Sequence, residues 1–359
     1  MSQRPFCTQA PVFVSGREGY HTFRIPAIIT TPAGGVLAFC EGRREGMGDS
    51  GDINLVLKRS FDGGETWQPM TVVAEDGANT VGNPCPVIDR DTGTIWLLLT
   101  HNLGEDTEAE IVNRTSKGTR RVWVTKSTDD GVTWSPPVDI TAATKAPDWT
   151  WYATGPGGGV QLRSGRLVIP CDHIVAGSNV YRSHVMYSDD HGATWQLGGA
   201  VGDAVNECQV IERRDGSLLL NMRNYDRLQA NRRAISISTD GGITWSPVTY
   251  DAALIEPICQ AGLLRFTQAP PHRRDRLLFS NPASCGRVNM TVRLSYDEGE
   301  TWPVWKALFR GPSAYSCLAA LPDLTIGCLY ERGEAHPYET ITLARFSLAW
   351  LTDGADQIA

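Results

Sequence analysis

The sequence predicts an all-β protein, a six-bladed β-propeller with four antiparallel strands in each blade. A repeated octapeptide and the short strand-like segments between its copies carry this prediction. In addition, the 36 glycines and 21 prolines are spread along the 359 residues. Such a distribution is typical of many short strands joined by turns rather than of domains joined by a linker.

The octapeptide S-x-D-x-G-x-T-W occurs five times without a mismatch. Its copies are Ser60–Trp67, Ser127–Trp134, Ser188–Trp195, Ser238–Trp245 and Ser295–Trp302. Asp can accept hydrogen bonds from backbone N–H groups two residues on, and the Gly tolerates positive φ, so the motif predicts a turn between strands. The Ser and the Thr-Trp pair should lie on the flanking strands. None of the five Asp residues is expected to be catalytic.

Between the copies, short apolar or alternating segments bounded by Gly, Pro, Asn and Asp predict β-strands. The expected strands include Ile53–Leu57, Thr94–Thr100, Arg121–Thr125, Arg166–Ile169, Ser217–Asn221, Ala234–Ser238, Arg276–Phe279 and Arg287–Leu294. No helical period of useful length appears.

The spacing of the copies predicts the number of blades. Successive copies start 67, 61, 50 and 57 residues apart, on average about 59, so 359 residues correspond to about six units. Each unit is long enough for the four strands of a propeller blade. The missing sixth copy fits chain ends that meet to close a ring, so residues 1–359 are predicted to form one domain.

Charge and cysteine content limit the partners and the compartment. A net charge of −7 argues against a nucleic-acid partner, and no apolar run is long enough to insert into a membrane. The N-terminus lacks an apolar signal region, and the nine cysteines are interpreted as buried free thiols. We therefore expect a cytoplasmic protein, with secretion left open.

The octapeptides resemble the Asp boxes of the sialidase (neuraminidase) superfamily, whose members are six-bladed propellers. Asp boxes also occur in propellers without sialidase activity, so by themselves they indicate fold rather than chemistry. Phe23-Arg24-Ile25-Pro26 resembles the F/Y-R-I-P motif of that family. The resemblance implies that Arg24, with Arg223 and Arg287, grips the carboxylate of sialic acid. Guanidinium suits this task because it binds carboxylates in a planar, bidentate way.

Three further segments resemble the parts of the family that carry chemistry. The first includes Gly48-Asp49-Ser-Gly-Asp52, where the resemblance favours Asp49 over Asp52 as the acid/base. Shortly before it, the resemblance favours Arg43 over Arg44 as an arginine beside the carboxylate. The others imply Glu207 as the base, Tyr315 as the nucleophile and Glu331 as a supporting, substrate-binding residue.

These residues imply a retaining exo-α-sialidase that hydrolyses terminal sialic acids of glycoconjugates. A neutral tyrosine avoids the repulsion that a carboxylate nucleophile would meet at a sugar carbon bearing its own carboxylate. Glu207 would take the phenol proton, and Asp49 would protonate the leaving oxygen and later deprotonate water. The only partner expected is the sialylated glycan, and the chemistry needs no metal or organic cofactor.

One segment departs from the family pattern. After Leu167–Pro170, animal cytosolic sialidases place tyrosines near the sugar's glycerol side chain, whereas this chain has Cys171-Asp172-His173-Ile174. The preference for the substrate's tail and acyl group therefore stays open, and His173 is interpreted as structural. Alternatives are a sialidase that prefers the deaminated sugar, a trans-sialidase, or a non-catalytic sialoglycan-binding propeller. The sequence does not set the linkage preference or the oligomeric state.

Overall fold

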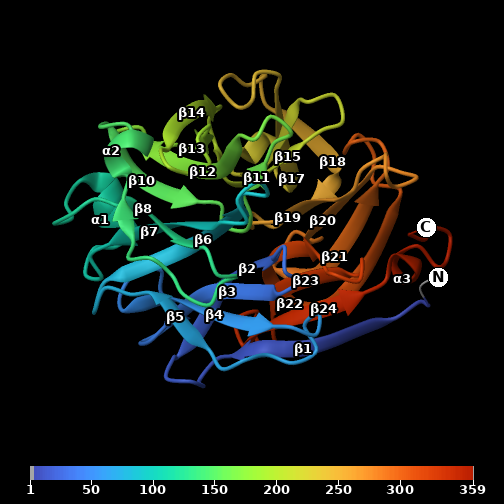
Figure 1. Cartoon of the computed structure of the whole chain (residues 1–359). Coiled ribbons are helices and arrows are strands. Elements are labelled where there is room, and N and C mark those ends of the chain that lie inside the picture. The colour runs from blue at the N-terminus through green and yellow to red at the C-terminus, as the bar shows by residue number, and fades with distance from the viewer. Residues whose placement is uncertain (1–3, 359) are drawn as a thin grey trace.

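The computed structural model describes residues 4–358, and almost all of its regular structure is β-strand (Figure 1). Antiparallel groups of strands follow one another around the molecule in chain order, as the change from blue to red shows. Each of the eight predicted strand segments overlaps a strand of the structure. The predicted all-β fold is therefore confirmed.

Most groups contain four strands that pair in the order of the chain. The first group is β2 (Thr22–Thr30), β3 (Val36–Arg43), β4 (Ile53–Ser60) and β5 (Thr71–Ala74), and the second is β6 (Thr80–Ile88), β7 (Ile95–Asn102), β8 (Arg121–Ser127) and β9 (Val138–Asp139). Next come β10 (Trp149–Thr154), β12 (Leu167–Val175), β13 (Tyr181–Ser188) and β14 (Gln196–Val201), with the short β11 (Val160–Gln161) also on β12. They are followed by β15 (Val205–Glu212), β16 (Leu218–Asn224), β17 (Arg232–Ser238) and β18 (Thr249–Ile255).

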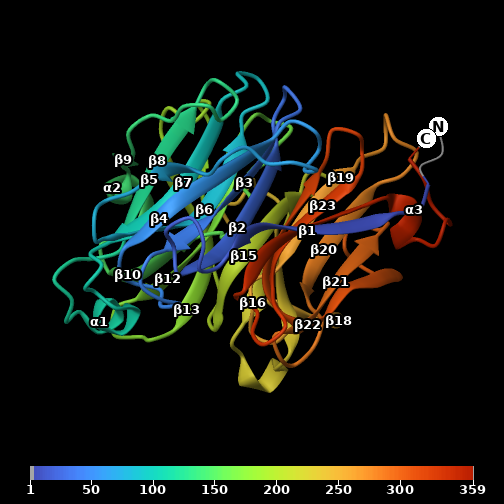
Figure 2. The same ribbon diagram turned by 90° about the horizontal axis from the view of Figure 1, so that it is seen from below.

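The last strands form a continuous sheet that also includes the first strand of the chain. β19 (Gly262–Thr267), β20 (Arg276–Pro282) and β21 (Val288–Ser295) lead to the long β22 (Val304–Ala320), and β23 (Ile326–Arg332) and β24 (Thr340–Phe346) follow. The first half of β22 pairs with β21 and the second half with β23. β1 (Cys7–Val14) then completes the sheet by pairing with β24, so that Cys7 lies opposite Phe346 (Figure 2).

The hydrophobic core is divided into clusters that lie between neighbouring groups. Leu98 on β7 shares a cluster with Ile169 on β12, and Leu219 on β16 shares another with Phe279 on β20. The first and last groups meet in the same way, because Phe23 of β2 packs in one cluster with Leu329 of β23. Burial of these apolar faces holds each group against its neighbours.

The repeated octapeptides form the predicted turns, with one difference in their hydrogen bonds. In the first copy, Ser60 Oγ accepts a bond from Gly64 N at 2.8 Å, and Asp62 Oδ1 accepts bonds from Glu65 N at 3.0 Å and Thr66 N at 2.9 Å. The Asp therefore caps N–H groups three and four residues on, not two as the turn chemistry predicted. A hydrogen bond from the Thr66 hydroxyl, and then the bond from its backbone N–H, lower the pKa of the exposed Asp62 carboxyl.

Glycine is required at the fifth position of the octapeptide. Gly131 has a φ of +79°, and a Cβ there would lie 2.7 Å from Leu37 Cδ1. The tryptophans that end the copies pack against the sheets, as Trp134 does edge-on against Phe39 with ring centroids 5.7 Å apart. The octapeptides are therefore structural, as the sequence predicts.

Helices are few and short. They are α1 (Glu108–Asn113), α2 (Thr141–Thr144), α3 (Leu348–Leu351) and the 3₁₀ turn η1 (Arg227–Gln229). Within residues 4–358, every helix falls short of the length and apolarity needed to cross a lipid bilayer. All nine cysteines are free, and seven are buried, but Cys285 is exposed and Cys7 half-buried, so the prediction of buried thiols is wrong for these two.

Candidate active site

A polar cavity of about 350 Å³ opens at one end of the first strands of several groups. It is lined by every site residue that the sequence predicts except Glu331: Arg24, Arg43, Asp49, Glu207, Arg223, Arg287 and Tyr315. These residues come from strands and loops far apart in the sequence. The structure therefore brings the predicted site residues together in one place.

Interruptions in strand pairing aim these side chains into the cavity. The registers of β2, β6, β15 and β22 shift at residues 24–27, 82–85, 205–208 and 313–316 respectively. Ile25 and Asn83, each followed by proline, have positive φ values of 63° and 54°. Such bulges and uncommon backbone conformations re-aim side chains and gather at functional sites.

Tyr315 and Glu207 form a buried hydrogen-bonded pair at the base of the cavity. Tyr315 Oη donates to Glu207 Oε1 at 2.5 Å. Arg223 Nη1 donates to the other carboxylate oxygen at 2.6 Å and to Tyr315 Oη at 3.1 Å. Burial, and then the negative charge of Glu207, raise the pKa of Tyr315, so the phenol is protonated at neutral pH. The pair places a neutral phenol beside a carboxylate that can accept its proton.

The three predicted clamp arginines surround Tyr315. The guanidinium carbons of Arg24 and Arg287 lie 5.1 Å and 5.6 Å from the centroid of its ring, and Arg223 contacts its hydroxyl. Arg287 Nη1 also donates to the hydroxyl of Tyr338 at 2.8 Å. Three converging guanidinium groups suit an anionic ligand that carries a carboxylate.

Glu331 supports the clamp from behind the cavity wall and has no exposed surface. Its carboxylate accepts bonds from Arg24 Nε at 3.1 Å, Ile25 N at 2.9 Å and Tyr315 N at 3.0 Å. Although burial alone would lower it, the pKa of Arg24 is raised by the adjacent Glu331 and the two tyrosines. Glu331 thus joins the first and last groups and fixes both an arginine and the tyrosine. The sequence predicted it to bind substrate, but Glu331 is absent from the cavity lining.

Asp49 lies at the cavity mouth with 63% of its side chain exposed. Its Oδ1 is 2.8 Å from Arg43 Nη1 and 3.6 Å from Arg24 Nη1. Partial loss of contact with water would raise the pKa of the Asp49 carboxyl, but the charges of Arg43 and Arg24 outweigh this and lower it. Asp52, by contrast, pairs with Arg44 at 3.3 Å, and neither of these residues lines the cavity.

Arg43 is buried and holds the loop that carries Asp49. Its Nη1 donates to the carbonyl oxygens of Met47 at 2.6 Å and Gly48 at 2.9 Å, as well as contacting Asp49. Its Nε and Nη2 donate to Glu41 at 3.0 Å and 2.6 Å. Arg43 is therefore positioned to fix the loop that carries Asp49.

Sequence reasoning missed several residues of the cavity wall. They are Glu41, Glu108, Arg120, Trp151, Tyr181, Tyr225 and Tyr338, and Asp172 was noted only as part of a departure from the family pattern. Arg120 is buried and donates to Asn102 Oδ1 at 2.6 Å and to the carbonyl of Tyr152 at 2.8 Å, and burial lowers its pKa. The departure at 171–174 was the one signal that pointed to this wall.

Two other segments singled out in the sequence lie beside the site rather than in it. His173 is buried, its ring stacked on Trp149 at 3.4 Å between centroids, and it does not line the cavity. Among the glycines at 155–159, Gly157 lies so close to Gln209 that a Cβ would come within 2.6 Å of that side chain. His173 and the glycine-rich stretch therefore pack the strands behind the cavity.

Within residues 4–358, the atoms of one group of side chains are close enough to hold a metal ion together: Asp89, Asp91 and His191. This group is not part of the cavity. The buried Asp89 carboxylate already accepts hydrogen bonds from Gln161 Nε2 at 2.8 Å and Thr92 Oγ1 at 2.7 Å.

The cavity thus combines a tyrosine–glutamate pair, a cluster of arginines and an aspartate at its mouth, and the arginines suit an anionic ligand. Comparisons with known proteins agree. Residues 35–329 match the family model described as a BNR repeat-like domain. The sialidase of Micromonospora viridifaciens is 38% identical over 97% of this chain and 55% of that protein. The exo-alpha-sialidase of Aspergillus fumigatus is 35% identical over 98% of this chain and 93% of that protein.

Among solved structures, a Hadza microbial sialidase superposes with a TM-score of 0.87 and 31% identity, covering 96% of this chain and 69% of that one. The chain therefore belongs to the sialidase family, a family of glycoside hydrolases. It spans 55% and 62% of the length of the Micromonospora and Bacteroides fragilis sialidases that it matches.

Proposed function

We propose that this protein is a retaining exo-α-sialidase that hydrolyses terminal sialic acids from glycoconjugates through a tyrosyl-linked intermediate. The observation that carries the proposal is the 2.5 Å hydrogen bond from Tyr315 to Glu207 with Arg24, Arg223 and Arg287 around it. This arrangement combines a nucleophile, its base and a carboxylate clamp. The curated relatives named as sialidases support the same reaction.

The proposal includes a closed six-bladed ring formed by residues 1–359 as one domain. The successive four-stranded groups support it, and so does the cluster in which Phe23 packs with Leu329, because this joins the last group to the first. In such a ring the first strands of the groups line the centre. The shifts of β2, β6, β15 and β22 would then gather their side chains at one end of it.

In the first half of the reaction, the arginines hold the sugar carboxylate and orient the anomeric carbon above Tyr315. The phenol oxygen attacks that carbon while Glu207 takes the phenol proton. The glycosidic C–O bond breaks, and its electron pair goes to the leaving oxygen, which takes a proton from Asp49. A tyrosine suits this step because it brings no charge toward the carboxylate.

In the second half, Asp49 removes a proton from water as the water oxygen attacks the same carbon. The bond to Tyr315 breaks, and the phenolate recovers its proton from Glu207. Two inversions give net retention. Asp49 must carry a proton to begin, although Arg43 and Arg24 lower its pKa in the free protein. A substrate carboxylate bound to Arg24 would offset that positive charge and raise the pKa of Asp49 when the proton is needed.

Release of the fluorophore from a 4-methylumbelliferyl α-sialoside tests the activity. Tyr315→Phe should reduce the rate by several orders of magnitude, because it removes the nucleophile. Tyr187→Phe is the matched control, since the hydroxyl of Tyr187 bonds to Gln196 outside the cavity. NMR of the first product should show the α-anomer. Sialoside binding without turnover would instead support a non-catalytic propeller, and transfer of the sugar to added lactose would support a trans-sialidase.

A further inference from the structure

Asp172 is a buried carboxyl group on the cavity wall that makes no hydrogen bond. It lies on β12, is 1% exposed and lines the same cavity as Tyr315. Both of its side-chain oxygens are buried without a partner. Buried polar atoms in proteins are almost always hydrogen-bonded, so an orphaned pair on a ligand cavity calls for an explanation.

The surroundings of Asp172 favour the neutral acid. An isolated carboxylate away from water is costly unless it is paired, and such a group takes up a proton instead. Burial, and then the nearby carboxylates of Glu207 and Glu108, raise its pKa, and Arg223 and Arg120 do not offset them. A neutral carboxyl group offers one O–H donor and one carbonyl acceptor.

Two more groups on the cavity wall also lack partners. Asn206 Oδ1 is a buried acceptor on β15, and Arg223 Nε is a buried donor on β16. The strands are close at this point, since Cys208 Sγ lies 3.4 Å from the carbonyl oxygen of Cys171, the residue before Asp172. This wall therefore offers both donors and acceptors that the protein itself does not use.

A hydroxyl group complements such a wall because it donates and accepts at the same time. Close by on the cavity wall, Tyr181 stacks on Tyr225 with ring centroids 4.9 Å apart and donates its hydroxyl to Glu108. The arginine clamp fixes the carboxylate end of the sugar. Sialic acids carry hydroxyl groups on their three-carbon tail, and deaminated ones carry a further hydroxyl at C5.

We propose that Asp172 is a specificity-determining residue whose carboxyl group hydrogen-bonds to a hydroxyl group of the bound sugar. The inference rests on the proposed sialidase function. On this proposal, the Cys171–Ile174 segment, which lacks the tyrosines of animal relatives, selects substrates that carry a hydroxylated substituent. That hydroxyl belongs either to the sugar's three-carbon tail or to C5 of a deaminated sugar, and the test separates the two.

The test compares three 4-methylumbelliferyl sialosides with the wild-type protein, Asp172→Asn and Asp172→Val. The substrates are the N-acetylated sugar, the deaminated sugar with a C5 hydroxyl, and the N-acetylated sugar with its tail shortened by periodate and borohydride. Asp172→Asn keeps a donor and an acceptor, so it should retain kcat/KM within about fivefold. Asp172→Val should lower kcat/KM about 10- to 100-fold for the substrate that carries the recognised hydroxyl.

With the wild-type protein, kcat/KM for the substrate that lacks the recognised hydroxyl should be lower by the same factor. Asp172→Val should lower kcat/KM for that substrate little further, because the interaction is already absent. If Asp172→Val abolishes the difference in kcat/KM between the full and the shortened tail, the recognised hydroxyl lies on the tail. If it abolishes the difference between the deaminated and the N-acetylated sugar, the recognised hydroxyl is the one at C5. Equal losses for all three substrates would overturn the inference. The wild-type and Asp172→Asn arms remain informative even if Asp172→Val does not fold. A wild-type protein that turns over none of the substrates would contradict the sialidase proposal instead.

Discussion

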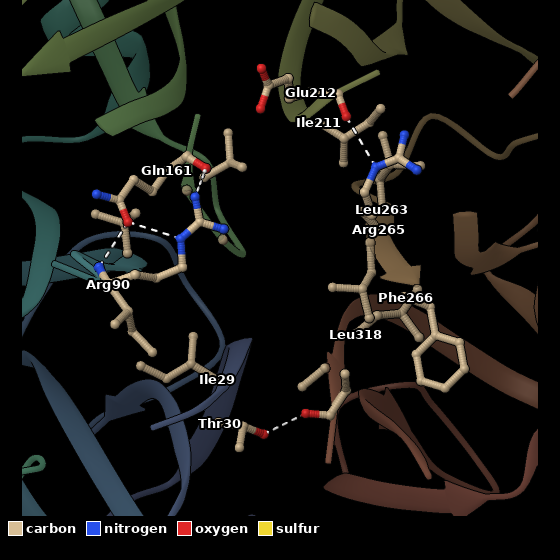
Figure 3. A pocket seen from close by; sticks show the side chains of 18 of the residues that line it. Ile29, Thr30, Arg90, Gln161, Ile211, Glu212, Leu263, Arg265, Phe266 and Leu318 are labelled. Atoms are coloured by element: carbon tan, nitrogen blue, oxygen red, sulfur yellow. Dashed lines mark hydrogen bonds between the residues drawn. The ribbon is translucent and has the colours of Figure 1, made fainter. Parts of the chain in front are cut away.

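Two cavities lie toward opposite ends of the same strands, and they differ in what their arginines contact. β2, β6, β15 and β22 line both. The cavity at the far end is the larger, about 790 Å³ against about 350 Å³. Figure 3 shows this larger cavity, with apolar side chains such as Ile29, Leu263 and Phe266 around it.

In the larger cavity the arginines are occupied by the protein itself. Arg90 Nε donates to Gln161 Oε1 at 3.0 Å, and Arg265 Nε donates to the carbonyl of Glu212 at 3.1 Å (Figure 3). In the smaller cavity, Arg287 donates to the hydroxyl of Tyr338, and Arg223 donates to the hydroxyl of Tyr315 and to the carboxylate of Glu207. Volume is therefore a poor guide to chemistry here, and the convergence of ionisable groups is a better one.

Replacing Glu207, the proposed base of the smaller cavity, should produce the largest kinetic difference between the two cavities. Glu207→Gln preserves the shape of the side chain but cannot take the phenol proton. We expect kcat to fall by about 10³- to 10⁴-fold, in the upper range for a positioned general base. Steady-state kinetics with the fluorogenic sialoside measures this. Unchanged turnover would remove Glu207 from the mechanism.

Two matched arginine substitutions, Arg287→Met in the smaller cavity and Arg265→Met in the larger one, compare the cavities directly. Arg287→Met removes one arm of the clamp, and kcat/KM should fall roughly 30- to 1,000-fold, as for the loss of one partner of a charge pair. Most of the change should appear in KM if the arginine binds ground state and transition state alike. A fall of less than threefold would mean that Arg287 is not part of the clamp.

Asp49 and Asp52 form a second matched pair, within one loop. Asp49→Asn should slow a sialoside with a lactose leaving group by about 10²-fold, but should slow one with a nitrophenol leaving group less than tenfold, because nitrophenolate departs without a proton. Asp52→Asn should change neither rate more than about twofold. If Asp52→Asn showed the dependence on the leaving group, the two roles would have to be exchanged.

The wall behind the smaller cavity should make stability sensitive to acid. Burial lowers the pKa of His173 to about 3, below the value of roughly 6.5 in an unfolded chain. As the pH falls below about 6.5, the unfolded chain takes up a proton that the folded protein does not, so stability is lost progressively toward pH 3. Urea unfolding at pH 7 and pH 5 should show that His173→Phe, which keeps a ring on Trp149, reduces this loss by about 2 kcal/mol. Parallel pH dependence of wild type and variant would contradict the assignment.

The smallest effect is expected in the larger cavity. Arg265→Met removes ion pairs with Glu298 and Asp275 and should lower the free energy of unfolding by about 1 kcal/mol. Its kcat/KM should stay within about twofold of the wild-type value. A larger kinetic effect would show that the two cavities are coupled, and would weaken the contrast drawn between them.

Much of the fold could be predicted from the sequence because the hydrogen bonds of the octapeptide are local. Its Ser, Asp and Gly bond to one another within five residues, so the turn forms wherever the motif occurs. The site residues were accessible only through family resemblance, and the structure places Asp49 rather than Asp52 in the cavity. Their catalytic roles stay predictions.

The remaining wall could not be predicted, for a physical reason. Glu108, Arg120 and Asp172 come from α1, the residue before β8, and β12, and only tertiary packing brings them together. Nothing in Glu108 or Arg120 as isolated residues separates them from exposed charges. The bulges that aim Asn206 and Glu207 into the cavity are likewise shifts in pairing between strands, which a single strand sequence does not reveal.

The pairing of β1 with β24 has a consequence for the time course of synthesis. Cys7 lies opposite Phe346, so β1 has no partner strand until β24 has also been translated. At about 5–20 residues per second, that interval is on the order of 20 to 70 seconds. Throughout it, β1 presents an unpaired strand edge, which is a template for pairing with another chain.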